Sequence, residues 1–344
     1  MKILGIETSC DETAAAVLEI NKSGIKILSD VVSSQIKIHK KYGGVVPEVA
    51  ARKHAELIFD IIEKALGKNK ISDMDLIAAT YGPGLVTSLR VGVLAGQTIA
   101  NLSNIPFVGV NHIEAHLLSP YLANKKIKLP ALGLIVSGGH TELVLVKKIG
   151  SYKLIGSTRD DAVGEAFDKV AKMLGLSYPG GPAVSASAEK ITNDELRITN
   201  IKFPRPMLNS NDFDFSFSGI KTSVLYFIKK LDSADLKKMM PVIAAEFQQA
   251  VIDVLVAKTM RAAKKYKIKS ILVGGGVSAN RELRKQLGEA IKKELPSADY
   301  FIPALEHTGD NAPMIALAGY HKYSRNKKNE VFKIEAEPNL IIAK

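Results

Sequence analysis

A single cysteine in 344 residues excludes intramolecular disulfides and thiolate-rich zinc clusters. The chain also lacks an uninterrupted apolar run long enough to span a bilayer, and no low-complexity linker interrupts it. Its opening residues, MKILGIETSCDE, reach acidic residues at once, so we expect neither a secretory signal nor an Arg-rich transit peptide. These absences favour a soluble protein of a reducing compartment. We therefore expect it in the cytoplasm, with no membrane partner.

Two common nucleotide-binding motifs are missing as well. No GxxxxGK[ST] segment occurs and no GxGxxG segment opens a predicted helix, so P-loop and Rossmann interpretations lose their main support. Three polar or glycine-rich turns follow predicted apolar strands instead: ETSCDET, VSGGHTE and GGGVSANRE. Such turns expose backbone N–H groups that can bind phosphate. Each signal is weak by itself, but the three together favour a nucleotide held between two domains.

The length of the chain fits about two domains of roughly 150 residues each. Hydrophobic residues make up 46% and charged residues 24%, which is ordinary globular usage. Because predicted strands alternate with predicted helices, we expect an α/β fold. We place an N-terminal α/β lobe at 1–129 and a C-terminal α/β lobe at 130–310, with a loop-rich insertion at about 177–220. A last helix, at about 311–330, is expected to pack back on the first lobe.

The charge balance bears on binding partners. The sequence has 47 Lys and Arg residues against 35 Asp and Glu residues, and residues 221–300 contribute 16 basic and 8 acidic positions. A concentrated positive surface suits a polyanion such as RNA, because neutralised phosphates release counterions. Residues 258–269 and 281–293 are the candidate contacts. The alternative is an ordinary solvated surface rich in lysine.

The segment HIEAH contains the sharpest candidate site. His112 and His116 are four residues apart, so on a helix both imidazoles lie on one face and can share a metal ion. Asp310, in a glycine-containing turn before a predicted helix, is a third candidate ligand, and this donor set suits Fe(II) or Zn(II). Glu114 lies roughly 200° around the helix from His112, so HIEAH is not the HExxH motif of metalloproteases. The alternative is a pair of ordinary helix histidines.

Other polar residues carry weaker signals. Asp11 and Glu12 are candidates for proton transfer or water organisation, although capping a turn would explain them equally well. Asp168 could bind a substrate hydroxyl or form a salt bridge with Lys169. Cys10 has no basic neighbour in the sequence, which favours a small packed side chain over a nucleophile.

Ten segments, in order along nearly the whole chain, carry a family resemblance. They are GIETSCDETAAA, YGGVVPEVAARKH, YGPGLVTSLRVG, VNHIEAH, VSGGHTELV, DDAVGEAFDKVAKMLGLSYPGGP, FPRPM, DFSFSGIKT, GGGVSANRELR and TGDNAPMIA. Together they resemble the TsaD family of tRNA threonylcarbamoyltransferases, formerly described as O-sialoglycoprotein endopeptidase. The resemblance implies the two-lobed actin-like ATPase superfamily fold, shared with acetate and sugar kinases, heat-shock chaperones and actin, with a nucleotide cleft between the lobes.

The resemblance also implies a reaction. Family members transfer the threonylcarbamoyl group of threonylcarbamoyl-AMP to N6 of the adenosine 3′-adjacent to the anticodon, in tRNAs that read ANN codons. The products are t6A and AMP. Two alternative functions are a small-molecule or sugar kinase of the same superfamily and, less favoured, a metallopeptidase.

Site residues follow from the resemblance position by position. His112, His116 and Asp310 take the metal positions, with one divalent metal per subunit, for which we expect Fe(II), with Zn(II) as the alternative. The residues that fall where the adenylate is held are Ile135, Val136, Ser137, Gly138, Gly139, Asp168, Gly181, Ser185 and Asn280. Several bacterial relatives are acidic at the Ser185 position, which leaves its contact to ribose or base open.

One departure separates branches of the family. Ile135 and His140 stand where the archaeal and eukaryotic cytosolic branch has a metal-binding Tyr and an Asn. The sequence therefore resembles the bacterial-type branch, which implies protein partners of the TsaB and TsaE kinds beside tRNA and threonylcarbamoyl-AMP.

Overall fold

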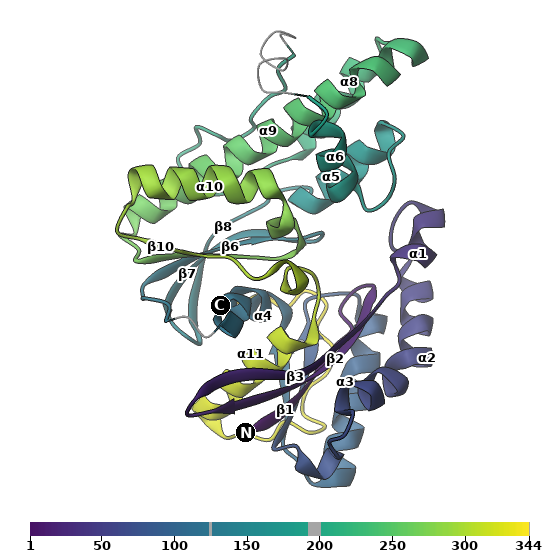
Figure 1. Cartoon of the computed structure of the whole chain (residues 1–344), viewed down its shortest axis with the longest axis vertical. Helices are drawn as coiled ribbons and strands as arrows, with labels where there is room; N and C mark the ends of the chain where they lie inside the picture. Colours follow the sequence, from purple (N-terminus) through teal and green to yellow (C-terminus); the bar gives the residue numbers. More distant parts are fainter. Residues whose placement is uncertain (124–125, 192–200, 344) are drawn as a thin grey trace. The chain divides into compact units, whose positions relative to one another are not determined.

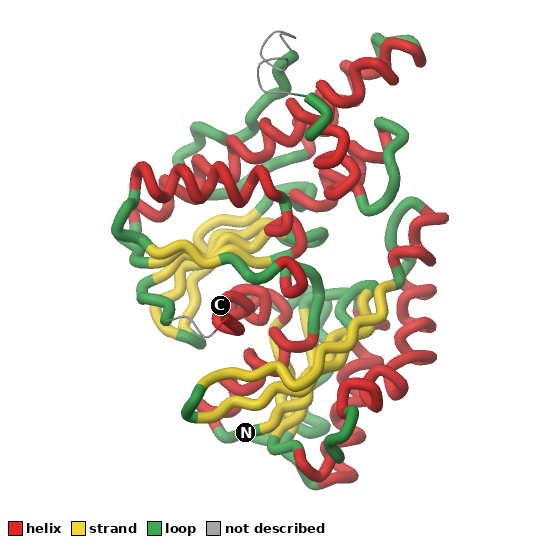
Figure 2. The backbone as a smooth tube through the Cα atoms, viewed as in Figure 1, coloured by secondary structure: helices red, strands yellow, loops and turns green. Residues whose placement is uncertain are grey.

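The computed structural model describes residues 1–123, 126–191 and 201–343. Residues 192–200 of the predicted loop-rich insertion lie outside these described residues. The chain forms two units, each with one five-stranded sheet (Figures 1 and 2). Unit 1 contains Met1–Ile127, Lys147–Lys153 and Ile302–Lys344, and unit 2 contains Lys128–Val146 and Leu154–Phe301.

The sheet of unit 1 has the strand order β3-β2-β1-β4-β5. Its strands are β1 (Lys2–Glu7), β2 (Glu12–Asn21), β3 (Gly24–Ser34), β4 (Leu76–Gly82) and β5 (Phe107–Asn111). β1 pairs antiparallel with β2 and parallel with β4, and β4 pairs parallel with β5. The carboxyl ends of β1, β4 and β5 therefore meet at one edge of the sheet, where ligands of open α/β sheets bind.

Helices cover both faces of this sheet. They are α2 (Pro47–Leu66) and α3 (Val86–Ser103) on one face and α4 (His112–Leu118) and α11 (Ala312–Asn326) on the other, while the short α1 (Ile36–His39) follows β3. Because side chains alternate along a strand, Leu4 and Ile6 pack with α2 and α3, whereas Ile3 packs with α4 and α11. Gly5 shares the face of Ile3, and a Cβ atom there would lie 2.4 Å from the carbonyl oxygen of Ala312. Glycine at this position lets α11 approach the sheet backbone to backbone.

Unit 2 repeats this topology. Its strands are β6 (Ala131–Val136), β7 (Thr141–Lys148), β8 (Ser151–Ser157), β9 (Ser270–Gly274) and β10 (Asp299–Phe301), in the order β10-β9-β6-β7-β8. β6 pairs antiparallel with β7 and parallel with β9, as β1 does with β2 and β4. The strand, turn and antiparallel strand that open unit 1 therefore recur at the start of unit 2.

The described helices of unit 2 lie along the chain from Val163 to Glu294. They are α5 (Val163–Met173), α6 (Gly180–Ala188), α8 (Ser218–Ile228), α9 (Ser233–Lys265) and α10 (Arg281–Glu294). α9 begins at Ser233 because Asp232 caps it, accepting a hydrogen bond from Asp235 N at 2.8 Å, and Pro241 is tolerated inside it. Among the described residues, α9 is the one helix with the length and composition to cross a membrane, but 61% of its most apolar stretch is buried within the protein.

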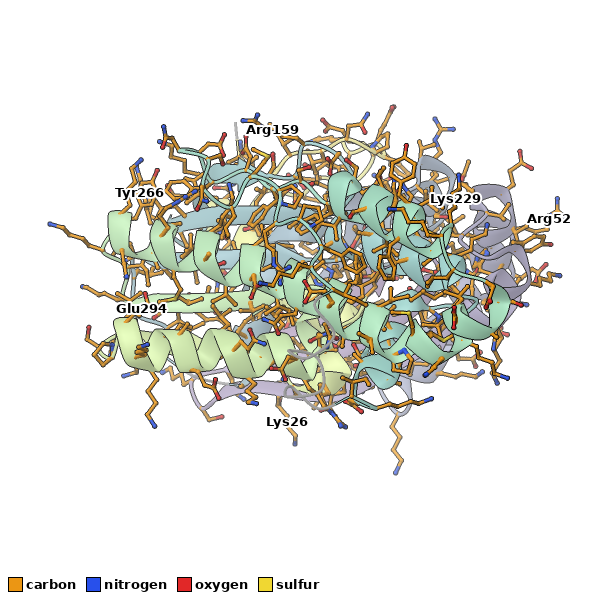
Figure 3. The ribbon with its side chains drawn as sticks, turned by 90° about the horizontal axis from the view of Figure 1, so that it is seen from above. Lys26, Arg52, Arg159, Lys229, Tyr266 and Glu294 are labelled. Atoms are coloured by element: carbon orange, nitrogen blue, oxygen red, sulfur yellow. The ribbon has the colours of Figure 1, made fainter. Side chains whose placement is uncertain are left out.

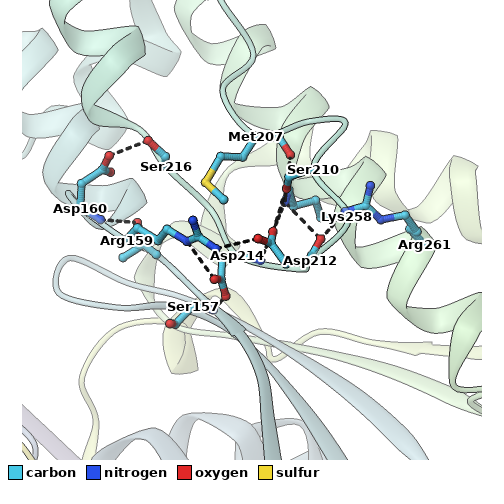
Figure 4. A network of polar contacts seen from close by, with 11 residues as sticks. Ser157, Arg159, Asp160, Met207, Ser210, Asp212, Asp214, Ser216, Lys258 and Arg261 are labelled. Atoms are coloured by element: carbon cyan, nitrogen blue, oxygen red, sulfur yellow. Dashed lines mark hydrogen bonds and ion pairs between the residues drawn. The ribbon is translucent and has the colours of Figure 1, made fainter.

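Charged side chains hold the described part of the insertion against its neighbours (Figure 4). Lys258 of α9 donates a hydrogen bond to Ser210 Oγ at 2.8 Å, Arg261 donates to the carbonyl of Asp212, and Arg159 pairs with the Asp212 carboxylate at 2.7 Å. Lys258 is fully buried. The prediction that residues 258–269 form an RNA-binding surface is therefore wrong for Lys258, whose ammonium group is used inside the fold.

We predict that Gly5→Ala destabilises unit 1. The new methyl group would meet the backbone of α11, and such overpacking typically costs about 1–3 kcal/mol. Gly44→Ala is the matched control, because no atom lies within 4 Å of a Cβ built there. Thermal unfolding followed by circular dichroism should show a lower Tm for Gly5→Ala alone. Equal Tm values for the two variants would mean that α11 moves to accommodate the methyl group without loss of thermal stability.

Candidate active site

The two predicted metal-binding histidines are positioned by the start of α4. Asn111, the last residue of β5, accepts hydrogen bonds on Oδ1 from Ile113 N at 2.9 Å and Glu114 N at 3.0 Å. This N-cap begins the helix at His112, directly at the carboxyl end of a parallel strand. His112 and His116 consequently share one face of α4, with ring centroids 4.5 Å apart.

Asp310 lies between these two rings. Its Oδ1 atom is 3.1 Å from His116 Nε2 and 3.4 Å from His112 Nε2. The turn is fixed by Asn311, which caps α11 by accepting a hydrogen bond from Met314 N at 3.1 Å. The three ligand atoms lie within 4.8 Å of one another, although 194 residues separate His116 from Asp310. Two imidazole nitrogens and one carboxylate oxygen fit Fe(II) or Zn(II) with open positions for a substrate oxygen.

Glu7 completes this cluster, although no motif in the sequence marks it as a member. The side chain is fully buried at the end of β1. Its Oε2 atom lies 3.0 Å from His112 Nδ1 and accepts a hydrogen bond from Thr80 Oγ1 at 2.6 Å, while Ser9 N donates to Oε1. A carboxylate can only accept here, so Nδ1 of His112 carries a proton and Nε2 is the nitrogen that faces Asp310 and the candidate metal position. A metal-binding histidine usually has such a carboxylate partner.

The charges of the cluster are coupled. Burial opposes ionisation throughout, yet the carboxylates of Asp310 and Glu7 raise the pKa of His112 well above its ordinary value. Burial and then the nearby His112 charge lower the pKa of His116. Although burial alone would raise it, the two histidines hold the pKa of Asp310 below its usual range. The cluster is thus a buried site of negative potential, which favours a cation.

Asp11 and Glu12 lie on the turn between β1 and β2, in the same unit. Burial, followed by the negative charges of Asp11 and Asp310, raises the pKa of Glu12 to about 9. Ser34 Oγ donates a hydrogen bond to Glu12 Oε1 at 3.0 Å. This raised pKa favours the protonated carboxyl of Glu12, which can donate a hydrogen bond.

His54 of α2 holds the same turn through two hydrogen bonds. Its Nε2 atom lies 2.9 Å from the carbonyl oxygen of Cys10, and its Nδ1 atom lies 2.8 Å from Thr13 Oγ1. Since the carbonyl only accepts, Nε2 carries the proton and Nδ1 accepts from the threonine hydroxyl. Burial lowers the pKa of His54, which keeps this neutral form. Burial also raises the pKa of the Cys10 thiol, in keeping with a packed side chain.

The Glu114 carboxylate contacts Tyr152 and Arg325. Its Oε1 atom accepts a hydrogen bond from Tyr152 OH at 2.8 Å and lies 3.7 Å from a guanidinium nitrogen of Arg325. The carboxylate that a peptidase would need as a base is therefore occupied elsewhere in unit 1.

The predicted substrate residues at 135–139 form the end of β6 and the turn that follows. Ser137 Oγ accepts a hydrogen bond from His140 N at 3.1 Å, and the Ser137 carbonyl accepts one from Gly164 N, at the start of α5, at 3.1 Å. Ile135 and Val136 supply the buried backbone leading into this turn. No atom lies within 4 Å of a Cβ built on Gly138 or Gly139, so a ligand can approach their backbone closely.

Ser185 and Asn280 are brought together in unit 2. Asn280 Nδ2 donates to Ser185 Oγ at 3.0 Å and to Gln248 Oε1 at 2.8 Å, and Ser185 Oγ donates to Gln248 at 2.8 Å. Gln248 of α9 had no signal in the sequence. Gly181 lies one helical turn before Ser185 on the same face of α6, with open space around it.

Asp168 holds the beginning of α6. Its Oδ1 atom accepts a hydrogen bond from Gly180 N at 2.6 Å. Lys169, the salt-bridge partner considered from the sequence, pairs with Asp161 at 2.6 Å and Glu165 at 2.8 Å. The predicted site residues thus form two groups, one in each unit.

Comparison with solved structures defines the fold class. HypF from T. kodakarensis matches with a TM-score of 0.62 at 15% identity, covering 96% of this chain, which spans about half (48%) of that protein. The activator of 2-hydroxyisocaproyl-CoA dehydratase from Clostridium difficile, determined with bound ADPNP, matches with a TM-score of 0.50 at 12% identity, over 95% of this chain and 98% of that one. These likenesses show the fold, an α/β fold with two five-stranded sheets, which agrees with the two-lobed fold that the resemblance implied.

Sequence comparison defines the family. Residues 26–317 match the family model TsaD, described as tRNA N6-adenosine threonylcarbamoyltransferase. Proteins of that name from Listeria welshimeri and Thermosipho melanesiensis are 47% and 48% identical over 342 residues, which is 99% of this chain and 96% and 99% of theirs. The chain belongs to the TsaD family.

We predict that Glu7 sets the metal affinity of this cluster. Glu7→Ala would leave the His112 ring without its carboxylate partner, and loss of such a partner typically weakens metal binding about 10–100-fold. Glu7→Gln, which keeps an acceptor but loses the charge, should fall between this variant and the wild type. Zinc affinity by chelator competition, with circular dichroism as the folding control, measures the effect. Wild-type affinity in a folded Glu7→Ala protein would contradict it.

Proposed function

We propose that this chain transfers the threonylcarbamoyl group from threonylcarbamoyl-AMP to N6 of the adenosine 3′-adjacent to the anticodon, in tRNAs that read ANN codons. The products are t6A and AMP. Family membership supports this acyl transfer. The observation that carries the proposal is the convergence of His112 Nε2 and His116 Nε2 on Asp310 Oδ1 inside unit 1.

The substrate is a mixed anhydride and is already activated, so positioning a weak amine matters more than a strong base. His112, His116 and Asp310 would hold one divalent metal per subunit, Fe(II) or alternatively Zn(II), which would supply Lewis-acid polarisation of the threonylcarbamoyl oxygens. Glu7 keeps the His112 ring in the tautomer and orientation that this requires.

The residues of unit 2 would bind the adenylate. Backbone N–H groups of Gly138 and Gly139 are suited to a phosphate or an oxyanion, because nothing fills the space beside them. The cluster of Ser185, Asn280 and Gln248 offers hydroxyl and amide groups to a nucleoside, without the carboxylate that several relatives have. In this proposal Asp168, by holding Gly180, keeps the backbone around Gly181 open to the ligand.

Glu12 and Asp11 would organise protons around the attacking amine. A carboxyl group that stays protonated at neutral pH can donate a hydrogen bond, while its neighbour accepts one. We assign the donor role to Glu12 and the acceptor role to Asp11.

The same proposal names the partners of the protein. The tRNA is the acceptor substrate, and proteins of the TsaB and TsaE kinds are the proposed helpers, acting in the cytoplasm.

The two alternative functions fit the site less well. A kinase of the same superfamily would not need the His112, His116 and Asp310 cluster. A peptidase would need a free base near it, whereas Glu114 is bound by Tyr152.

We expect His112→Ala to abolish t6A formation while the protein stays folded, because the cluster loses one of two imidazole ligands and the partner of Glu7. The assay combines the protein with tRNA, threonine, bicarbonate, ATP and the adenylate-forming enzyme, followed by mass spectrometry of nucleosides. Unchanged t6A in this variant would refute the role of the cluster. A phosphorylated metabolite or a cleaved glycoprotein, in place of t6A, would favour the alternatives.

We also expect Glu12→Gln to keep activity that Glu12→Ala loses, because glutamine retains an N–H donor. In the wild type the required proton is present below pH about 9 and is lost as the pH rises through that value, so activity should fall on the alkaline side. A bound cation moves this fall to lower pH, because positive charge favours the ionised carboxylate. The fall should be absent in Glu12→Gln. Equal inactivity of both variants would show instead that the carboxylate acts as a base.

A further inference from the structure

An exposed, positively charged stretch follows β3 in unit 1. We call the stretch 37–52 the basic segment; its charged and aromatic members are Lys37, Lys40, Lys41, Tyr42, Glu48 and Arg52. All four cations are exposed, and Tyr42 exposes 50% of its surface. Arg52, on the first turns of α2, extends outward from the ribbon (Figure 3).

The cations of the basic segment are not used to hold the fold. Within the part of the chain that the structure describes, none of Lys37, Lys40, Lys41 and Arg52 forms an ion pair, whereas the next residue, Lys53, pairs with Glu56 at 2.9 Å. Lys41 Nζ lies 5.0 Å from the centre of the Tyr42 ring. Unlike the buried Lys258, these cations are exposed, so they can meet a ligand together with the exposed half of Tyr42.

Buried contacts fix the segment beside the proposed catalytic turn. Just before it, Gln35 N donates to the carbonyl of Asp11 at 3.0 Å and Ser34 Oγ donates to Glu12 at 3.0 Å. Inside it, His39 is fully buried, with Nε2 3.3 Å from Gln35 Oε1 and Nδ1 accepting from Val46 N at 3.3 Å. The exposed side chains therefore project from a fixed base next to Glu12.

We propose that the basic segment binds the single-stranded RNA around the target adenosine. Lys37, Lys40, Lys41 and Arg52 would neutralise backbone phosphates, and Tyr42 would stack on an unpaired base. This inference rests on the proposed function and deepens it by naming where the tRNA docks.

Single-stranded RNA offers the chemical groups that the exposed side chains of the basic segment can bind. Proteins read single-stranded loops by stacking splayed bases on aromatic rings, with lysine and arginine along the backbone. An anticodon loop offers both groups, and the reaction requires one of its bases to reach the Asp11 and Glu12 turn. Four unpaired cations against one exposed acid, Glu48, give the segment the matching charge.

The test compares matched charge reversals in the full-length protein. The double variant Lys40→Glu with Lys41→Glu changes the segment, and Lys22→Glu with Lys26→Glu changes two exposed lysines at the opposite end of the β2–β3 hairpin. Affinity for a fluorescent anticodon stem-loop RNA is measured by anisotropy over a range of salt concentrations. We expect the first variant alone to bind at least tenfold more weakly and to reduce the salt slope by about one per lost phosphate contact.

Tyr42 is tested separately from charge. Tyr42→Ala should weaken RNA binding about tenfold with an unchanged salt slope, while Tyr42→Phe, which keeps the ring, should bind as the wild type does. Zinc affinity and Tm serve as controls, because neither metal binding nor folding uses these side chains.

The outcomes separate this inference from the function on which it rests. Wild-type RNA affinity in the Lys40 and Lys41 variant, or equal loss in the Lys22 and Lys26 control, would overturn the inference while wild-type t6A formation stands. Absence of t6A from the complete wild-type reaction would instead overturn the proposed function, whatever the RNA affinities are.

Discussion

The close approach of α11 to β1 is the constraint on which the candidate metal site depends. Gly5 leaves no side chain between the strand and the helix, so the backbone at Ala312 comes almost into contact with it. Two residues further along β1, on the same face, stands Glu7, and two residues before Ala312 stands Asp310. The packing of one glycine thus sets the distance between two carboxylates, and α4 inserts His112 between them.

The electrostatics of the cluster follow from this crowding. Buried carboxylates are stable only when paired or neutralised, and Glu7 and Asp310 share the His112 imidazole. The field that raises the pKa of His112 is the field that would attract a divalent cation. A divalent cation held by Nε2 would compete with the proton that this field favours, so its affinity would fall as the pH falls, and the buried Thr80 and Ser9 donors hold Glu7 in place.

The sequence alone predicted those parts of the structure that follow a regular pattern of residue types or a regular spacing. Alternating apolar strands and helices predicted both sheets, and the spacing of His112 and His116 predicted their common helix face. Glu7 was not predicted, because its role depends on a ring 105 residues away, although a carboxylate ending a buried strand is a usable signal. Composition likewise could not tell the buried Lys258 from the exposed Lys40, since only the tertiary fold decides which lysine is covered.

The two sheets share one topology but have acquired opposite chemistry at the same place. The turn after β1 bears Glu7, Asp11 and Glu12, which suit a cation, whereas the turn after β6 bears Gly138 and Gly139, whose open backbone N–H groups suit an anion. An acyl adenylate needs both, because its acyl oxygens gain negative charge as the amine attacks and its phosphate departs as an anion. The same strand-turn-strand topology thus carries carboxyl groups in unit 1 and open glycines in unit 2.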